Sequence, residues 1–138
     1  MKALIVYDSV YGNTEEIARA VAGALTPAGE VKVLRVGEAN PLECESVDLL
    51  VVGSSTQGGK PTPAIQDFLS KIPANALKNV SVTSFDTRVK IIVARVFGYA
   101  AGRIADSLKD KGGHIAAPPE GFIVRSNFVM RLLISITH

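Results

Sequence analysis

The sequence has few of the residues that cross-link small proteins or bind metals. Its 138 residues include one cysteine, Cys44, and two histidines, His114 and His138. A single cysteine excludes an internal disulfide framework and any metal site that takes several cysteines from this chain. Two isolated histidines leave no recognisable Ser–His–Asp arrangement and no metal-ligand spacing. We therefore expect neither a metal centre nor a nucleophilic triad.

Long apolar runs and a strong charge of one sign are also missing. No stretch approaches the roughly 18 apolar residues that a membrane-spanning helix needs. The first apolar run, residues 3–7, meets Asp8 too early for a signal peptide. The net charge of +2 is too small to indicate nucleic-acid binding. We expect no membrane or nucleic-acid partner, and a reducing, cytoplasmic setting with which the single thiol agrees.

The composition is that of a globular protein, with 47% hydrophobic and 20% charged residues. The length is typical of one domain, which we expect to span residues 1–138. Apolar runs predict strands at residues 3–7, 31–36, 48–53 and 80–85, and a fifth strand at 114–117 and 122–124 that residues 118–121 (PPEG) split. Amphipathic stretches predict helices that begin with Thr14 and Thr62 as caps, and another helix over residues 99–111.

This alternation of strands and helices predicts a doubly wound α/β fold with a five-stranded parallel sheet covered on both faces. The last segment, residues 126–138, is almost wholly apolar, with Arg131 as its only charged side chain. We expect a short or altered final helix there, and a strand that pairs elsewhere is the alternative. Apolar surface left exposed by this segment would favour a homodimer.

The loop between the first predicted strand and helix carries the clearest sign of chemistry. From Ser9 to Thr14 it holds hydroxyls, an amide and a glycine, but no lysine or arginine. The first N–H groups of a helix and its dipole attract anions, and Gly12 lets the backbone approach one closely. A phosphate monoester fits such a neutral site, and a capped helix after a turn is the alternative.

Other phosphate-binding signatures do not match. The loop lacks the Gly-Lys-Ser/Thr of a P-loop and the Gly-x-Gly-x-x-Gly of a dinucleotide fold. A phosphoryl-accepting receiver domain would need an acidic residue at the end of the third strand, where Gly53 and Ser54 stand.

Three segments together resemble the flavodoxin family. Residues 7–18 (YDSVYGNTEEIA) are similar to its phosphate-binding signature, and residues 54–61 (SSTQGGKP) to the loop on one face of the flavin. Residues 85–88 (FDTR), followed by 97–102 (FGYAAG), are similar to the second flavin loop and its helix. The resemblance covers residues 1 to about 125. It implies strand order 2-1-3-4-5, non-covalent FMN and electron transfer.

The resemblance also implies roles for individual residues. The ribityl phosphate would be held by Ser9, Val10 through its backbone N–H, Tyr11, Gly12, Asn13 and Thr14. The isoalloxazine ring would be lined by Ser55, Thr56, Gln57, Gly58 and Gly59, and closed on its other side by Phe85, Asp86, Thr87 and Arg88. With no tryptophan in the chain, any stacking aromatic would be Tyr11, Phe97 or Tyr99. No catalytic side chain is expected, because the flavin carries the redox chemistry.

Two stretches depart from the family pattern, namely the apolar residues 90–96 (KIIVARV) within the second flavin region and the segment 126–138. Three functions stay open. The first is an FMN-binding electron-transfer protein that serves a redox partner protein or a small electron acceptor. The second is a small FMN-dependent reductase of quinones or similar acceptors. The third is a flavin-free binding domain that retains the fold, because fold alone does not fix function.

Overall fold

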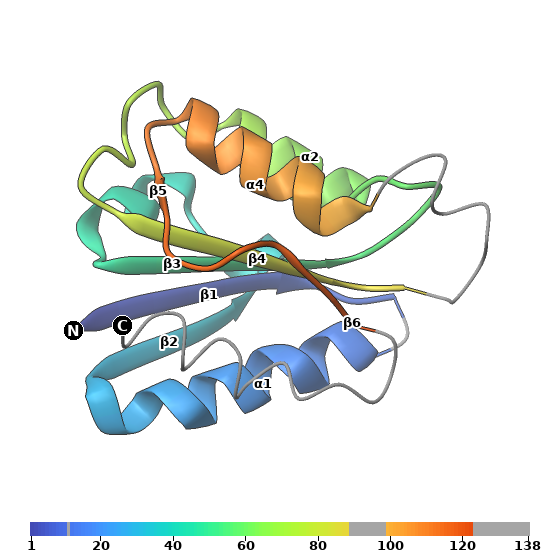
Figure 1. Cartoon of the computed structure of the whole chain (residues 1–138), viewed down its shortest axis with the longest axis horizontal. Helices are drawn as coiled ribbons and strands as arrows, with labels where there is room; N and C mark the ends of the chain where they lie inside the picture. Colours follow the sequence, from blue (N-terminus) through green and yellow to red (C-terminus); the bar gives the residue numbers. More distant parts are fainter. Residues whose placement is uncertain (11, 89–98, 123–138) are drawn as a thin grey trace.

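The computed structural model describes residues 1–10, 12–88 and 99–122. A sheet lies between two helical layers (Figure 1). Its strands are β1 (Lys2–Asp8), β2 (Glu30–Arg35), β3 (Leu49–Ser55), β4 (Ser81–Thr87), β5 (His114–Ile115) and β6 (Glu120–Phe122). The α-helices are α1 (Asn13–Leu25), α2 (Pro63–Ser70) and α4 (Ala100–Asp110). Short 3-10 helices are η1 (Thr26–Ala28), η2 (Val36–Glu38) and η3 (Pro41–Ser46).

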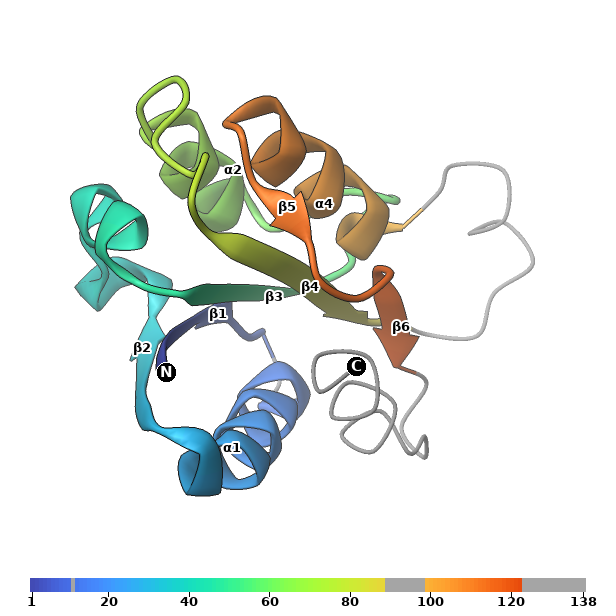
Figure 2. The same cartoon turned by 60° about the vertical axis from the view of Figure 1, so that its left-hand side comes forward.

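The strand order is β2-β1-β3-β4-β5, and every neighbouring pair is parallel. This confirms the predicted doubly wound α/β fold and its 2-1-3-4-5 order. The fifth strand is split, as the sequence predicts. Its first piece, β5, pairs with the beginning of β4, and its second piece, β6, pairs with the end of β4 (Figure 2).

The two faces of the sheet are covered by different helices. Helices α2 and α4 lie over one face and α1 lies over the other (Figures 1 and 2). Along β1 the side chains alternate, so Leu4 and Val6 pack on the α2–α4 side, and Ile5 packs on the α1 side. Because both faces are covered, β1 and β3 read as continuous apolar runs, which is the pattern expected of buried parallel strands.

Two strands run further than the sequence predicts. Ser54 and Ser55 belong to β3, and Asp86 and Thr87 belong to β4, whereas the sequence pattern placed all four in loops. The parallel ladder continues through them and pairs Ser54 with Asp86 and Ser55 with Thr87. Backbone pairing with a neighbouring strand here outweighs the weak strand preference of serine and aspartate. These polar side chains are therefore positioned by strands rather than by loops.

The first helix begins differently from the prediction that Thr14 caps it. Gly12 is the N-cap residue, with φ 87° in the left-handed region. Thr14 lies inside the first turn and is completely buried. Its hydroxyl bonds to Ser55 and Thr87 in other elements, so it does not cap its own helix. The predicted cap of α2 is confirmed, since the Thr62 side chain accepts a hydrogen bond from the Ile65 N–H at 3.4 Å.

Some predictions fall on segments outside the described residues. These are the apolar stretch 90–96, the aromatic Phe97 and the final segment 126–138. Within the described part of the chain, no helix combines the length and the apolar character needed to cross a membrane.

Candidate functional site

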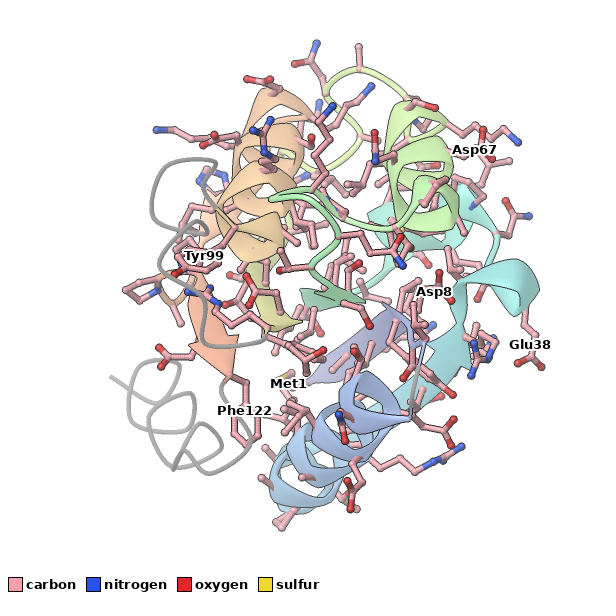
Figure 3. All side chains as sticks on the ribbon, turned by 90° about the vertical axis from the view of Figure 1, so that its right-hand side faces the viewer. Met1, Asp8, Glu38, Asp67, Tyr99 and Phe122 are labelled. Carbon is pink, nitrogen blue, oxygen red and sulfur yellow. The ribbon has the colours of Figure 1, made fainter. Side chains whose placement is uncertain are left out.

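The carboxyl ends of the parallel strands meet at one edge of the sheet, where ligands of open α/β folds bind. Figure 3 looks onto this edge, with Asp8 at the end of β1 and Tyr99 just before α4. Three segments that were predicted to contact a cofactor arrive here, namely the β1–α1 loop, the end of β3 with its following turn, and the end of β4.

The β1–α1 loop and the first turn of α1 form the candidate anion cradle. The Gly12 N–H donates to Ser9 Oγ at 2.8 Å, and the Gly12 carbonyl accepts the first intrahelical hydrogen bond, from the Glu16 N–H at 3.1 Å. The N–H groups of Asn13, Thr14 and Glu15 precede that first bond, so they have no acceptor within the helix. Gly12 needs its glycine for its positive φ rather than for space, because a Cβ there would meet no atom within 4 Å.

Three hydroxyl groups converge beside this cradle. Thr14 Oγ1 lies 2.8 Å from Thr87 Oγ1 and 3.1 Å from Ser55 Oγ. Ser55 Oγ also accepts a hydrogen bond from the Val10 N–H at 3.3 Å. The cluster joins the loop after β1 to the ends of β3 and β4. Its donors are neutral, which suits a phosphate group held by amides and hydroxyls rather than by cationic side chains.

A tight turn follows β3. Gln57 and Lys60 exchange backbone hydrogen bonds of 2.8 and 3.0 Å, and Gly58 and Gly59 between them have φ angles of 58° and 79°. Two consecutive residues with positive φ in a two-residue loop form a type I′ turn, which strongly favours glycine. The turn is held to α4, because Arg103 Nε donates to the Gly59 carbonyl at 2.9 Å.

The end of β4 carries a buried ion pair. Asp86 is fully buried, and Arg88 donates to both of its carboxylate oxygens at 2.7 Å. Asp86 Oδ2 also accepts the Ala101 N–H at 2.8 Å, which ties the strand to the first turn of α4. The Arg88 guanidinium lies 3.2 Å from the centroid of the Tyr99 ring. The Arg88 guanidinium also packs closely against Gly121. A Cβ at position 121 would lie only 1.9 Å from the guanidinium carbon, so only glycine leaves room for it.

The residues predicted to close the other side of a flavin ring thus have different surroundings. Phe85 is fully buried on the α1 face of the sheet, and its ring occupies the space that a Cβ on Gly53 would need. The polar atoms of Asp86 and Arg88 face each other. Thr87 turns to the hydroxyl cluster instead. That these four residues contact a ring stays a prediction, as does the role of Tyr11, which lies outside the described residues.

A second charged group lies on the α1 side of the cradle. Arg35 at the end of β2 contacts Asp8 at 3.3 Å and Glu15 at 3.6 Å. A hydrogen bond from Arg19, followed by one from the Tyr7 hydroxyl, lowers the pKa of Glu15. Glu15 therefore stays ionised in the first turn of α1, where a negative charge is favoured by the helix dipole.

Sequence reasoning missed two contributions to this site. Arg103 holds the glycine turn, and Gly121 makes room for the Arg88 guanidinium. Neither has a local signal, because each acts on a residue more than thirty positions away. The pairing of Ser55 with Thr87 had a signal in principle, since both end neighbouring parallel strands.

A parallel doubly wound sheet in the order 2-1-3-4-5 is the flavodoxin-like architecture, and the candidate cradle follows its first strand. The flavodoxin family model matches residues 5–122. The chain belongs to the flavodoxin family, whose members bind FMN and transfer electrons.

Individual relatives agree with this assignment. A flavodoxin of Nitratidesulfovibrio vulgaris is 33% identical over 125 residues, which cover 79% of this chain and 84% of that protein. Diflavin flavoprotein A 4 of Synechocystis sp. is 35% identical over 83 residues, covering 56% of this chain. The match spans only 14% of that diflavin flavoprotein and, in a similar protein of Nostoc sp., 11%.

Solved structures show the same fold. A flavodoxin of Streptococcus pneumonia TIGR4 superposes with a TM-score of 0.82 at 19% identity, covering 99% of this chain and 96% of that one. Oxidised flavodoxin 1 of Bacillus cereus superposes with a TM-score of 0.77 at 19% identity, covering 100% of this chain and 99% of that one.

Proposed function

We propose that this chain binds one FMN at the carboxyl edge of the sheet and passes electrons to a redox partner protein or a small acceptor. The observation that carries the proposal is the candidate cradle at the start of α1, where first-turn amides without an acceptor inside the helix lie beside a buried hydroxyl, Thr14. The bound flavin would supply the redox chemistry. The chain would bind its phosphate and orient its ring.

The residues present fit the phosphate of FMN. A phosphate dianion only accepts hydrogen bonds, and the cradle offers donors from backbone amides, hydroxyls and the exposed Asn13 side chain. The helix dipole adds a favourable field without any cationic side chain in the loop. The ring would lie against the Gly58–Gly59 turn, which is exposed at Gly58 and buried at Gly59.

The test is a flavin titration of the full chain with FMN and with riboflavin, which lacks the phosphate. We expect tighter binding of FMN, and about 100-fold weaker FMN binding in the Asn13→Ala/Thr14→Ala double variant, since hydrogen bonds to a charged group are worth about 1.5–3 kcal/mol each. Thr26→Ala, just past the other end of α1, serves as the control and should bind as wild type does. A wild-type chain that binds neither flavin would instead support the flavin-free binding domain.

A second candidate, a small FMN-dependent reductase of quinones, has one specific observation in its favour. The NAD(P)H dehydrogenase (quinone) of Methylocella silvestris is 32% identical over 91 residues, which cover 51% of this chain and 46% of that protein. Steady-state oxidation of NAD(P)H by the FMN-loaded chain in the presence of a quinone would favour the reductase. Its absence, with electrons still accepted from a separate reductase, would favour the carrier.

We also propose a cytoplasmic location. Its support is the single cysteine, Cys44, which is buried and has no partner cysteine in the sequence. A chain that uses no disulfide suits a reducing compartment. Fractionation of the native host with an antibody to the chain tests this, and recovery outside the cytoplasm would contradict it.

A further inference from the structure

Thr87 occupies an unexpected place in the candidate site. Its hydroxyl lies 2.8 Å from Thr14 Oγ1, in the first turn of α1. Its partner in the β3–β4 ladder is Ser55, whose hydroxyl lies 3.1 Å from the same Thr14 oxygen. Thr14 is therefore the middle member of a row of three hydroxyls that come from three different elements.

The position of Thr87 is fixed by its backbone and by its neighbours. Its carbonyl accepts the Thr56 N–H at 2.9 Å. On one side Asp86 is fully buried and bonded to α4, and on the other the Arg88 N–H donates to the Phe122 carbonyl at 3.2 Å. A hydroxyl carried on so constrained a strand end is preorganised, which is what precise positioning of a binding group requires.

Counting protons shows what this arrangement can do. Each hydroxyl donates one hydrogen bond and accepts two. If Thr87 and Ser55 both donate to Thr14 Oγ1, they use its two acceptor positions, and the single proton of Thr14 is free to donate to another acceptor. A phosphate oxygen at the start of α1 only accepts, so the row works best as a relay from Thr87 to Thr14 to the anion. Hydrogen bonds in such a chain polarise and strengthen one another.

We propose that Thr87 is a positioning residue for the phosphate, because its hydroxyl donates to Thr14 Oγ1 and so aims the Thr14 proton at the anion. This inference rests on the proposed function, in which the anion is the phosphate of FMN. In this role Thr87 acts through Thr14. A contact of Thr87 with the flavin ring, which the family resemblance implies, is a separate prediction, and its loss would weaken riboflavin as well as FMN. The alternative is that the three hydroxyls only join α1, β3 and β4, in which case their loss would affect every flavin alike.

The experiment compares FMN and riboflavin binding by the full chain and its Thr87→Val variant. Valine keeps the β-branch that suits a strand and removes only the hydroxyl. We expect FMN affinity to fall about 5- to 10-fold, as for the loss of one hydrogen bond that supports a charged acceptor. Riboflavin affinity should stay within about twofold, because riboflavin has no phosphate.

Two further variants make the test specific. Thr83→Val removes another hydroxyl from β4, one that donates to the Ala117 carbonyl at 3.2 Å, and should leave both affinities within about twofold of wild type. Thr87→Ser keeps a hydroxyl at the same position and should restore most of the FMN affinity. If Thr87→Val does not fold, Thr87→Ala removes the same hydroxyl and takes its place in both titrations.

The outcomes distinguish a failure of the phosphate assignment from a failure of the role proposed for Thr87. If the wild-type chain shows no preference for FMN over riboflavin, the phosphate assignment fails and the role of Thr87 fails with it. If the wild type prefers FMN but Thr87→Val weakens both flavins equally, or neither, the cradle stands and the proposal for Thr87 is overturned. A 31P signal of bound FMN that shifts in Thr87→Val and not in Thr83→Val would support the proposal independently.

Discussion

Arg103 in the first turn of α4 donates from Nε to the carbonyl oxygen of Gly59, 2.9 Å away in the turn after β3. The two residues are 44 positions apart, so this bond links elements that the sequence gives no reason to connect. It holds one peptide of a turn whose two glycines both have positive φ. The turn is thus held by a side chain from α4.

Arg103→Met should weaken flavin binding on the ring side of the site. Methionine keeps much of the apolar stem and removes the hydrogen bond to Gly59. We expect FMN and riboflavin affinities to fall together by about fivefold, the effect of about 1 kcal/mol. Parallel flavin titrations measure this. Arg19→Met, which removes the exposed contact with Glu15, is the matched control, and an FMN-selective loss in Arg103→Met would contradict the assignment.

Asp86→Asn should be strongly destabilising, because it leaves the Arg88 guanidinium largely buried without its carboxylate. The expected loss in free energy of unfolding is about 3 kcal/mol. Urea denaturation measures it. Asp67→Asn is the matched control, since its ion pair with Lys71 is exposed at both ends, and it should cost no more than about 0.5 kcal/mol. Equal losses in the two variants would show that burial of the Asp86–Arg88 pair has no special weight.

Two glycines should respond in opposite directions to alanine. A Cβ on Gly53 would lie 2.1 Å from the Phe85 ring, so Gly53→Ala should cost about 1–3 kcal/mol through overpacking. A Cβ on Gly23 in α1 would meet nothing within 4 Å, so Gly23→Ala should stabilise the helix by about 0.5–1 kcal/mol. Thermal unfolding of the two variants checks both signs, and stabilisation by Gly53→Ala would place the Phe85 ring elsewhere.

The Cys44 thiol should not react with a thiol reagent in the folded protein at neutral pH. Burial, followed by the charges of Glu43 and Glu45, raises its pKa from 9.0 to about 12. The unfolded chain therefore loses this proton first as the pH rises, and the free energy of unfolding should fall between about pH 9 and 12. Cys44→Val should lack that component of the decline. Rapid labelling of the native protein at pH 8 would contradict the burial of this thiol.

The layered fold was predictable because each strand and helix has its own local hydrophobic pattern in the sequence. Unbroken apolar runs such as residues 49–52 mark strands buried on both faces, and the helices between them predict parallel pairing. The split of the fifth strand was also visible, because residues 118–121 interrupt an apolar pattern. Strand ends were less predictable. Ser55 and Thr87 are held in strands by pairing with each other, which is a tertiary effect that propensity does not contain.

The candidate site was predictable as a region but not in its contacts. The composition of the loop from Ser9 to Thr14 and its place before a helix predict an anion site. The burial of Thr14 follows from the convergence of three elements, and so it is visible only in three dimensions. The same holds for the pairing of the Arg88 guanidinium with the buried Asp86 carboxylate.

The most direct test of the account is a crystal structure of the chain grown with FMN. We expect the phosphate to lie against the N–H groups of Asn13, Thr14 and Glu15, with one phosphate oxygen accepting a hydrogen bond from the Thr14 hydroxyl. Flavin bound with its phosphate elsewhere, or a first turn of α1 closed off by its own loop in the presence of saturating FMN, would contradict it.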